Sequence, residues 1–538
     1  MNSQSEVDLS LLSWVNAFLN GRNLESHFTH NAIWRDYLAM EWDLQTHEGW
    51  SEISKALPDE MGGKLISISS ETPKEVIFSF ERKNRRIKAL AEIHQKKCVR
   101  LFTSLDVMPS LDSAIDAPPA VLIIGAGQSG LALAAHLKDL GVPYLVSEKN
   151  PRIGDNWRKR YSSLVLHDPV WMNHLPFKRF PDDWPTFTPK NMMGDWLEEY
   201  AKSLQLNVQC NSEVTSAEFD KTQGTWSVEI RAGGVEQNLS VQHLVFAVGT
   251  SGFPKQPRIK GHEGFLGRQL HSSEYRTGSD FSGQSVVIVG ATNSAHDIAV
   301  DLVNHGATPT LVQRSSTHVV PHQIYIDDIL SPLYGPEHKR PLSEADFQSL
   351  AKPMRLLERH GKAIFKKAQH EWKNFYDELS KTGFAIDFAE DGSGIIGKYR
   401  RSASGYYIDV GGSQLVIDGK IEVKTGKNIK SITAGGLTLD DDSTLNCDAI
   451  IYATGFGSME EWVSRVIDEP TANKIGRCWG YGSGYRGDPA PWEGELRNMW
   501  KPTAQQGLWF MGGNLAQVRI YSRYLAMQLC ESVRRLTI

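Results

Sequence analysis

The sequence is poor in cysteine and contains no long apolar run, and both absences narrow the class of protein. Only 5 of the 538 residues are cysteine, they lie far apart, and none forms a C-x-x-C pair. This usage predicts no disulfide framework and no metal site, and it is typical of a reducing compartment. No stretch approaches the roughly 18 apolar residues of a membrane span. The first residues also lack a basic region followed by an apolar one, so we expect a cytoplasmic protein without a secretory signal.

The chain also has no excess of positively charged residues. The chain has 58 Lys and Arg residues against 63 Asp and Glu residues, a net charge of -5, with the two signs mixed. Nucleic acid is therefore not expected as the main partner. A chain of this length exceeds what one hydrophobic core supports, so roughly two to four domains are expected.

A glycine-rich turn between an apolar run and a helical pattern is the strongest motif in the chain. Val121–Ile124 is typical of a buried parallel strand. Gly125, Gly127 and Gly130 follow in the G-x-G-x-x-G spacing. In such a motif the first glycine permits the tight turn, the second lets the backbone approach a pyrophosphate, and the third lets helix and strand pack closely. The phosphates lie at the helix N-terminus, where free N–H groups favour negative charge.

An acidic residue at the end of the next strand completes this pattern. Tyr144–Glu148 predicts that strand, and it ends in Glu148, where a carboxylate can accept hydrogen bonds from ribose hydroxyls. A glycine-rich turn in an ordinary α/β unit is the alternative. The strand, the helix and the acid together favour a dinucleotide-binding domain.

A second strand–turn–helix segment, Ser285–Ala299, predicts another nucleotide site. The strand after it ends in Arg314, where a site for NAD would usually carry an acid. A guanidinium suits a 2′-phosphate through bidentate, charge-assisted hydrogen bonds. We therefore expect NADPH rather than NADH at this second site.

Three further motifs follow in order along residues 119–538. Gly154 and Trp157 come after the acidic strand, Phe265–Tyr275 fits F-x-G-x-x-x-H-x-x-x-[YF], and Cys447–Gly457 contains Ala-Thr-Gly-Phe. With the two glycine-rich turns, these motifs resemble the flavin-containing monooxygenases, including their auxin-forming branch. The resemblance implies two Rossmann-like domains, one for FAD and one for NADPH.

The resemblance also implies roles for individual residues. Gly154 and Trp157 lie along FAD in the family, and Asn173 is the candidate to face the reactive edge of the flavin. A surface loop asparagine is the alternative for Asn173, because Asn is a common turn residue. His271 sits at the domain junction and helps to position NADP, with a purely structural hinge role as the alternative.

The second turn departs from the family at one position. The family usually has G-x-G-N-S-[GA], and Gly290, Asn293 and Ser294 match it, whereas Thr292 replaces the middle glycine. A side chain there would hold the pyrophosphate slightly farther out or donate its hydroxyl to it. The match for the nicotinamide cofactor is therefore weaker than the match for FAD.

The last segment is expected to return to the first domain. The Cys447–Gly457 strand is predicted to re-enter the first sheet, and Gly513, Asn514 and Gln517 are predicted to aim the last helix at the pyrimidine side of the flavin. The remaining candidate cofactor-binding residues in the motifs above and the segments between them are Gln128, Ser129, Lys149, His167, Val214, Gly249, Ser315, Thr454 and Gly455.

Residues 1–118 show a different pattern, with helices first and strands later. Helices are predicted at Leu9–Leu24 and Trp50–Leu57, and strands at Ile66–Ser69, Val76–Phe80, Lys88–His94 and Lys97–Ser104. This order is typical of an α+β domain. The segments Trp34–Met40, Trp42–Gly49 and Arg100–Ser104 resemble the NTF2-like (SnoaL-like) cone domains.

The resemblance to cone domains leaves two interpretations of this segment. Asp36, His47 and His94 are candidates for groups in a pocket, since such cones hold a pocket in some enzymes. We prefer a lid, a dimerisation surface or a stabilising partner, because polar residues on a strand face are usually solvated. Asp112–Pro119 is the predicted linker.

The predicted fold class is α/β, with two Rossmann-like dinucleotide-binding domains after an α+β cone domain. We predict an NTF2-like domain with its linker at 1–118 and the first part of the FAD-binding domain at 119–275. The NADPH-binding domain follows at 276–439 with a helical insertion at about 321–400, and the second part of the FAD-binding domain at 440–538. A homodimer is left open.

The resemblance implies a monooxygenase that uses FAD, NADPH and O2 on a small organic substrate. In the family cycle a flavin C4a-hydroperoxide passes one oxygen to a soft nucleophile, which gives N- or S-oxygenation. Oxidative decarboxylation of an indole-3-pyruvate-like α-keto acid and Baeyer–Villiger oxidation are alternatives; Baeyer–Villiger enzymes usually carry tryptophan where this chain has Tyr275. A non-catalytic flavin-binding sensor is an alternative of another class. A flavin disulfide reductase is disfavoured, because no cysteine lies between Cys98 and Cys210.

Overall fold

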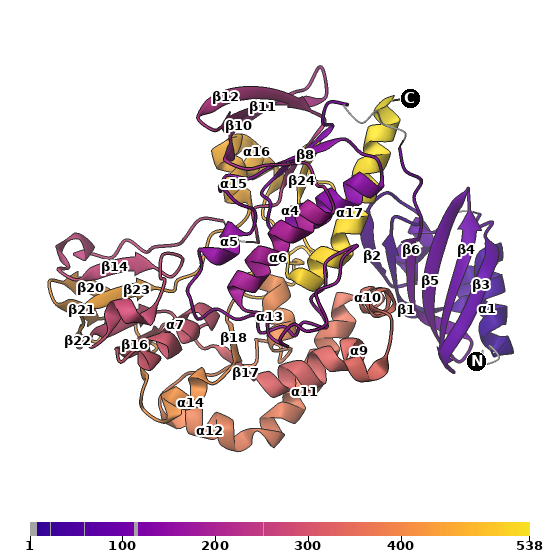
Figure 1. The fold of residues 1–538 in the computed structure, drawn as a ribbon. Helices are drawn as coiled ribbons and strands as arrows, with labels where there is room; N and C mark the ends of the chain where they lie inside the picture. Colours follow the sequence, from indigo (N-terminus) through magenta and orange to yellow (C-terminus); the bar gives the residue numbers. More distant parts are fainter. Residues whose placement is uncertain (1–7, 22, 59, 112–116, 251, 538) are drawn as a thin grey trace.

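The protein is described by a computed structural model that covers residues 8–537 apart from residues 22, 59, 112–116 and 251. Three units built on sheets and a layer of helices make up the molecule (Figure 1). Most of the predicted linker Asp112–Pro119 lies outside the described residues. Within the described part, no helix combines the length and the apolar character needed to cross a bilayer.

The N-terminal unit, indigo in Figure 1, is a six-stranded sheet with three helices. The strand order is β2-β1-β6-β5-β4-β3, and only β1 and β6 pair in parallel. Helix α1 carries apolar residues at helical spacing, and its Phe18 packs edge-on against Phe78 and Phe80. The elements are α1 (Leu9–Asn20), α2 (Leu24–His27), β1 (Phe28–Tyr37), β2 (Leu44–Glu48), α3 (Trp50–Ala56), β3 (Lys64–Thr72), β4 (Glu75–Arg82), β5 (Arg85–His94) and β6 (Lys97–Leu105).

The first parallel sheet contains the first glycine-rich motif. Its order is β24-β13-β7-β8-β9, and a three-stranded antiparallel sheet, β10-β11-β12, lies beside it. Strand β7 is almost wholly buried, which explains its continuous apolar sequence. The elements are β7 (Val121–Ile124), α4 (Gln128–Asp139), β8 (Tyr144–Ser147), α5 (Asp155–Arg158), α6 (Lys190–Ser203), β9 (Val208–Gln209), β10 (Ser212–Asp220), β11 (Thr225–Ala232), β12 (Val235–Val241), β13 (His243–Phe246), β24 (Leu508–Phe510) and α17 (Leu515–Thr537).

The second parallel sheet has the order β14-β23-β15-β16-β19 and contains the second glycine-rich turn. Helix α7 begins directly after that turn. The elements are β14 (Arg268–His271), β15 (Ser285–Val289), α7 (Asn293–Asn304), β16 (Thr308–Gln313), α14 (Gly412–Ile417), β19 (Glu422–Thr425), β20 (Ile429–Thr433), β21 (Gly436–Leu439), β22 (Thr444–Asn446) and β23 (Ala449–Tyr452).

One strand assignment from the sequence is wrong. The Cys447–Gly457 segment does not re-enter the first sheet, because β23 pairs with β14 and β15 of the second sheet. The chain returns to the first sheet only at β24, which pairs with β13. A buried apolar strand has no local feature that selects its sheet, so the error could not be seen in the sequence. The division of the chain at 118, 275 and 439 stays a prediction.

A helical layer is inserted between β17 and β18, close to the predicted range of about 321–400. It lies at the bottom of Figure 1 and reaches from the second parallel sheet towards the N-terminal unit. The elements are β17 (His318–Pro321), α8 (His322–Ile324), a π-helix (Tyr325–Leu330), α9 (Ser331–Tyr334), α10 (Leu342–Leu350), α11 (Met354–Glu371), α12 (Lys373–Lys381), α13 (Ile395–Ser402) and β18 (Tyr406–Asp409).

Candidate functional site

A cavity of about 600 Å³ lies at the carboxyl ends of β7 and β8, where α/β sheets usually bind ligands. We call it the main cavity. Residues of both glycine-rich turns reach it, because Ser294 of α7 is also part of its lining. The predicted cofactor residues that line it are Gly125, Gly127, Gln128, Ser129, Glu148, Lys149, Trp157, Val214, Gly249, Ser294 and Gly513.

The three glycines of the first turn have different surroundings. Gly125 has φ +104°, and a Cβ there would lie 2.8 Å from the carbonyl oxygen of Ala247. A Cβ on Gly130 would lie 2.0 Å from the oxygen of Gly125, so this glycine permits the contact between helix and turn. At Gly127 the only neighbour of an added Cβ is the Asn156 side chain, at 3.3 Å. Gly127 therefore leaves open the space over which a pyrophosphate would approach the backbone.

Glu148 is held against this turn by hydrogen bonds. Its Oε2 accepts from the N–H of Ala126 at 2.8 Å, and its Oε1 accepts from the backbone N–H and side chain of Asn150 at 2.8 and 2.7 Å. The side chain is buried at the rim of the cavity. The carboxylate thus has a defined position from which it can accept from a ribose.

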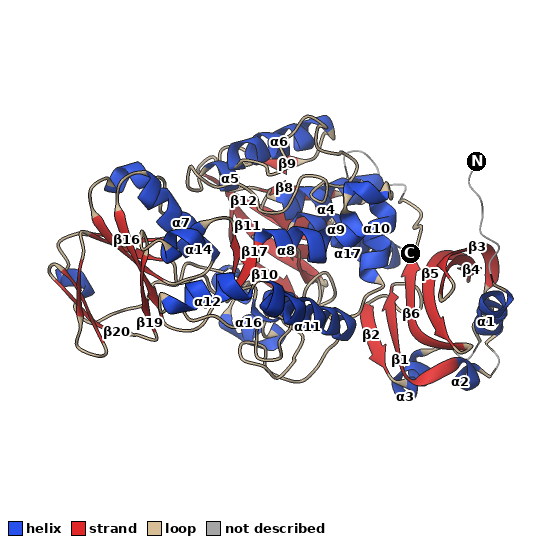
Figure 2. Ribbon diagram, turned by 90° about the horizontal axis from the view of Figure 1, so that it is seen from below, coloured by secondary structure: helices blue, strands red, loops and turns tan. Residues whose placement is uncertain are grey.

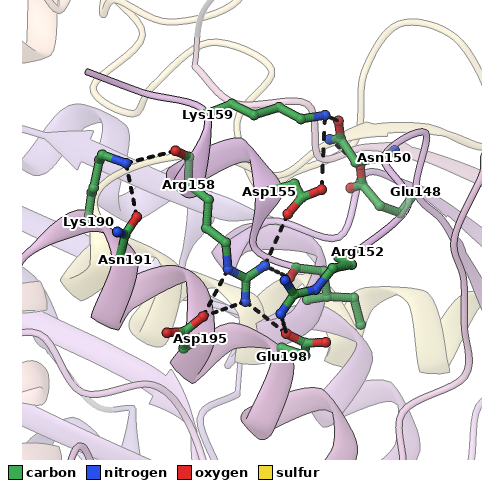
Figure 3. Close-up of polar contacts among 11 residues, drawn as sticks. Glu148, Asn150, Arg152, Asp155, Arg158, Lys159, Lys190, Asn191, Asp195 and Glu198 are labelled. Atoms are coloured by element: carbon green, nitrogen blue, oxygen red, sulfur yellow. Dashed lines mark hydrogen bonds and ion pairs between the residues drawn. The ribbon is translucent and has the colours of Figure 1, made fainter. Parts of the chain in front are cut away.

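Helix α5, which carries Trp157, is clamped onto α6 by ion pairs (Figure 3). The Arg158 guanidinium lies 3.1 Å from Asp155, 2.8 Å from Asp195 and 2.8 Å from Glu198. Glu198 also pairs with Arg152 at 2.7 Å. The role of Arg158 could not be predicted from the sequence, because two of its three carboxylate partners come from a helix about 40 residues away.

Gly154 lies outside the cavity lining and instead lets α5 approach α6. Its φ is +88°, and a Cβ there would lie 2.1 Å from the oxygen of Gly194. We expect Gly154→Ala to lower the melting temperature much more than Gly234→Ala. Gly234 has a similar φ of +85°, but a Cβ added there would have no atom within 4 Å. Alanine in the left-handed region costs about 1–2 kcal/mol at either site, and only Gly154 adds the clash. Thermal unfolding of both variants tests this, and equal losses would contradict the packing role.

The second turn has the geometry of a cradle but carries a side chain at its centre. Gly290 has φ +130°, and a Cβ there would lie 2.4 Å from the oxygen of Ala453. Thr292 is the N-cap residue of α7, and its side chain makes no capping hydrogen bond. Asn293 faces away from the main cavity, since its Oδ1 accepts from the N–H of Ile408 at 2.9 Å. Arg314 and Ser315 are exposed, and no carboxylate among the described residues pairs with Arg314.

The histidine of the F-x-G-x-x-x-H-x-x-x-[YF] motif is held by the protein on both ring nitrogens. The Nε2 of His271 lies 3.0 Å from the carbonyl oxygen of Gly455, so this nitrogen carries the proton. Its Nδ1 lies 2.9 Å from the Ser273 hydroxyl, and burial lowers the pKa of the ring. His271 is a buried, neutral link between β14 and the turn after β23, which favours the structural alternative.

The tyrosine of the same motif is also an anchor. Tyr275 is fully buried, and its hydroxyl donates to Asp301 of α7 at 2.7 Å. The N–H of Gly278 donates to the same oxygen at 2.8 Å. The motif therefore fixes α7, and with it the second turn, to the segment that joins the two parallel sheets.

Asn173 is buried, which excludes the surface-loop alternative. Its Nδ2 donates to the carbonyl oxygen of Asp168 at 2.9 Å, whereas its Oδ1 has no partner. The neighbouring carbonyls of Met172 and His174 accept from Arg519 of α17. Asn173 does not line the main cavity.

A second cavity of about 550 Å³ lies along α7, between the loop that follows α5 and the end of β18. It contains His167, which was predicted for the first site, and Asn293. Asp297 accepts from the Tyr161 hydroxyl at 2.6 Å, and burial raises the pKa of its carboxyl. The lining includes three aspartates and no lysine or arginine; it is formed by Ser163, Val165, Leu166, His167, Phe187, Asn293, Asp297, Val300, Asp301, Asn304, His322, Ile408, Asp409 and Val410.

The predicted residues before the last helix cap that helix. The N–H of Gln517 donates to Asn514 Oδ1 at 2.9 Å, and the N–H of Asn514 donates to Gln517 Oε1 at 3.2 Å, a reciprocal capping box. Gln517 also accepts from the Tyr399 hydroxyl. The Thr454 hydroxyl donates to the oxygen of Lys255. Thr454, Asn514 and Gln517 do not line the main cavity, whereas Gly513 does.

The candidate pocket groups of the N-terminal unit already have protein partners. Asp36 accepts from the Thr103 hydroxyl at 2.5 Å and from the N–H of Met40 at 3.0 Å. The ring of His47 packs on Trp34. His94 is exposed and bonds to Glu92.

Comparison with known proteins assigns the family. The family described as pyridine nucleotide-disulphide oxidoreductase matches residues 122–392, about half of the chain. The chain belongs to this family. The five cysteines are free and none lines either cavity, so the chain has no cysteine pair at the site.

Curated relatives and solved structures agree with the sequence motifs. The probable indole-3-pyruvate monooxygenase YUCCA1 of Arabidopsis thaliana is 32% identical over 344 residues, which cover 63% of this chain and 75% of that protein. The probable indole-3-pyruvate monooxygenase YUCCA9 of Arabidopsis thaliana is 40% identical over 205 residues, or 38% of this chain and 49% of that protein. The chain thus spans about half the length of the first relatives it matches.

A solved structure of OTEMO in complex with FAD and NADP has a TM-score of 0.52 and 18% identity, and covers 78% of this chain and 86% of that one. At this identity the likeness shows the fold alone. The predicted resemblance to the flavin-containing monooxygenases is confirmed, and so is the α/β fold, which is similar to that of flavin monooxygenases.

Proposed function

We propose that the protein is an FAD- and NADPH-dependent monooxygenase that acts on a small soft nucleophile. One observation carries the proposal: the two strand–turn–helix cradles open onto one cavity, with Gly125–Ser129 on one side and Ser294 on the other. Each strand–turn–helix cradle suits the pyrophosphate of one dinucleotide, so two cradles at one cavity would bring two dinucleotides together. The names of the relatives, which are monooxygenases, support the same chemistry.

The residues of the main cavity fit FAD. The α4 N-terminus offers backbone N–H groups to a pyrophosphate, Gly127 leaves room for it, and Glu148 is placed for a ribose. Lys149 and Arg160 in the lining add positive charge for the phosphates. When bound, FAD supplies electron transfer from NADPH to O2, whereas the chain binds, orients and excludes water.

Ser294 and the turn before it would hold the pyrophosphate of NADPH at the N-terminus of α7. His271 is neutral and already bonded, so it orients the domain junction and moves no proton. We propose that Gly154 and Asn173 act by shaping the site, since neither lines the main cavity.

The lining of the second cavity favours a neutral or cationic substrate over a substrate that carries a carboxylate. It adjoins the main cavity, because Tyr161 lines the main cavity and donates to Asp297 of the second. Its lining offers carboxyl groups and no lysine or arginine to pair with a carboxylate, so it would suit a protonated amine better than an α-keto acid. Amine or sulfide oxygenation is therefore our first candidate. The names of the relatives favour oxidation of an indole-3-pyruvate-like acid as the second.

Mixing with NADPH tests the proposal. We expect the purified protein to be yellow, to lose its visible flavin absorbance with NADPH under anaerobic conditions, and to recover it with O2. Substrate-stimulated NADPH use, with the mass of one added oxygen in the product, would identify an amine or sulfide substrate. Loss of carbon dioxide from an α-keto acid would favour the second candidate. Bound flavin that NADPH never bleaches would indicate a non-catalytic sensor.

Arg314 is expected to set the preference for NADPH. Because it is exposed and free of carboxylate partners in the described chain, it is available to a 2′-phosphate. Arg314→Ala should lower kcat/KM for NADPH by about 10- to 100-fold and leave NADH unchanged, as expected for a charge-assisted contact worth about 1.5–3 kcal/mol. Steady-state kinetics with both cofactors measure this. The exposed Arg258→Ala is the control, and an unchanged NADPH/NADH ratio in Arg314→Ala would refute the assignment.

We also propose an NTF2-like cone fold for residues 1–118. The six-stranded sheet with α1 packed on it supports this, together with the resemblance of the segments around Trp34 and Arg100.

A further inference from the structure

The N-terminal unit shares its hydrophobic core with the rest of the protein. Tyr37, Phe102 and Leu105 belong to the same buried cluster as β7, α4 and α17. In both views, the β1–β2 edge of its sheet faces the rest of the molecule, and α1 lies on the far side (Figures 1 and 2). The unit is therefore not a separate body on a linker.

A buried carboxylate at this junction is bonded almost entirely by the N-terminal unit. Glu495 lies between α16 (Glu469–Ile475) and β24, and only 5% of it is exposed. Arg35 donates to it through Nε at 2.6 Å and through a terminal nitrogen at 2.7 Å. The hydroxyls of Tyr37 and Thr46 donate at 2.8 and 2.7 Å. All four hydrogen bonds come from β1 and β2.

The charge of Glu495 is stable only with these partners. Burial alone would favour the neutral acid, but the Arg35 guanidinium and the hydrogen bonds hold the pKa of Glu495 below its usual range. Arg35 also donates to the carbonyl oxygen of Leu350 at the end of α10. A buried, bidentate pair of this kind is sensitive to loss of one partner, because the other charge remains buried.

From this junction, aromatic contacts lead to the main cavity. The hydroxyls of Tyr37 and Tyr521 lie 3.3 Å apart. The Tyr521 ring stacks on Trp500 at 3.7 Å, with the planes 8° apart. The indole N–H of Trp500 donates to the carbonyl oxygen of Gly512 at 2.9 Å, and the next residue, Gly513, lines the cavity. Gly513 has φ +126°, a backbone conformation that glycine adopts and other residues rarely do.

We propose that the N-terminal unit is a positioning element for the cofactor site, which it serves by holding the Gly512–Gly513 turn through Arg35–Glu495 and Tyr37–Tyr521–Trp500. It contributes no reacting group. The inference rests on the proposed function only in that the cavity holds FAD. The candidate pocket groups Asp36, His47 and His94 are bonded or packed within the unit, and they take no part in holding the Gly512–Gly513 turn.

The test uses point variants of the full chain, because deletion of residues 1–118 would expose the shared core. Arg35→Met removes the charge but keeps an unbranched side chain. Arg86→Met is the matched control, since the Arg86 side chain is 52% exposed and pairs with Asp106, outside the buried Arg35–Glu495 pair. Two measurements are needed: the FAD dissociation constant from flavin fluorescence, and hydrogen exchange of the amides from Gly512 to Gln517 in the FAD-free protein.

We expect Arg35→Met to weaken FAD binding by about tenfold or more and to speed exchange at Gly512–Gln517, with Arg86→Met unchanged on both counts. The double variant Arg35→Met/Glu495→Met should recover part of both effects, because no buried charge is left unpaired. If Arg35→Met does not fold, Tyr37→Phe is used in its place. It removes one hydroxyl that donates to Glu495, and it should weaken FAD binding and speed exchange by smaller amounts.

Normal FAD affinity and normal exchange at Gly512–Gln517 in folded Arg35→Met and Tyr37→Phe would overturn the proposal. Failure of the proposed function would look different: the wild-type protein itself would bind no FAD. The exchange measurement would still report whether the N-terminal unit holds the turn.

Discussion

Gly127→Ala is expected to yield a folded protein that has lost most of its FAD. The backbone at Gly127 has φ -77°, which alanine adopts without strain, and the only atom near the added Cβ is the flexible Asn156 side chain at 3.3 Å. The fold should therefore survive. The methyl group would nevertheless stand where a pyrophosphate must approach the N–H groups of the turn. Losing one or two charge-assisted contacts of about 1.5–3 kcal/mol each would weaken binding by about 10-fold to more than 1,000-fold.

The flavin-to-protein absorbance ratio after purification, a titration with FAD and a thermal melt measure this together. Gly264→Ala is the control, because a Cβ there meets nothing within 4 Å and the residue lies outside the cavity. A Gly127→Ala protein that keeps full FAD would remove the first turn from the cofactor site. Gly125→Ala is the opposite comparison, because its φ of +104° is strained for alanine and the variant is expected to lose stability as well as FAD.

Asp36→Asn is expected to stabilise the N-terminal unit above pH 6. Burial raises the pKa of Asp36 to about 6, although Thr103 and two backbone N–H groups donate to it. The folded form then binds a proton that the unfolded chain releases near pH 4, so the stability due to this group is lost as the pH rises between about 4 and 6. The penalty reaches about 3 kcal/mol at neutral pH, and about half of it arises between pH 5 and 7.

Hydrogen exchange of the β1 and β6 amides at pH 5 and pH 7 can measure this local free energy. Relative to wild type, Asp36→Asn should gain about 1–1.5 kcal/mol of stability between the two pH values. A matched control is Asp106→Asn, which removes a partly exposed carboxylate that pairs with Arg86 and Arg523. A wild-type unit whose stability does not fall over this range, or a variant with the same pH dependence, would show that Asp36 is ionised without penalty.

Residues that act through their immediate neighbours in the chain could be predicted from the sequence. The first glycine-rich turn is one example, since strand, turn and helix are contiguous, and Gly125 and Gly130 have close contacts that match their spacing. The capping pair Asn514 and Gln517 was also found, although for a different reason: they bond to each other and do not line the cavity. Local backbone conformation depends on a few adjacent residues, so it can be predicted from them.

Contacts between distant segments could not be predicted. Strand β23 was assigned to the wrong sheet, because every buried parallel strand has the same apolar pattern. The partners of Arg158 on α6, and the burial of Asn173 next to the residues that bond to Arg519 of α17, likewise follow from packing between elements. The Arg35–Glu495 pair joins residues 460 positions apart, and neither has a local motif.

The sequence by itself determined the motifs on which the predicted chemistry rests: two glycine-rich turns, the order of the family motifs, and a cation where a site for NAD would usually carry an acid. The tertiary structure decided which residues meet at the cavity, that His271 and Tyr275 serve as anchors, and that the first hundred residues are joined to the rest by a buried ion pair. The reason is physical. A cradle is specified by the backbone conformations of a few neighbouring residues, whereas the docking of whole sheets and helices depends on the summed fit of surfaces that no short stretch records.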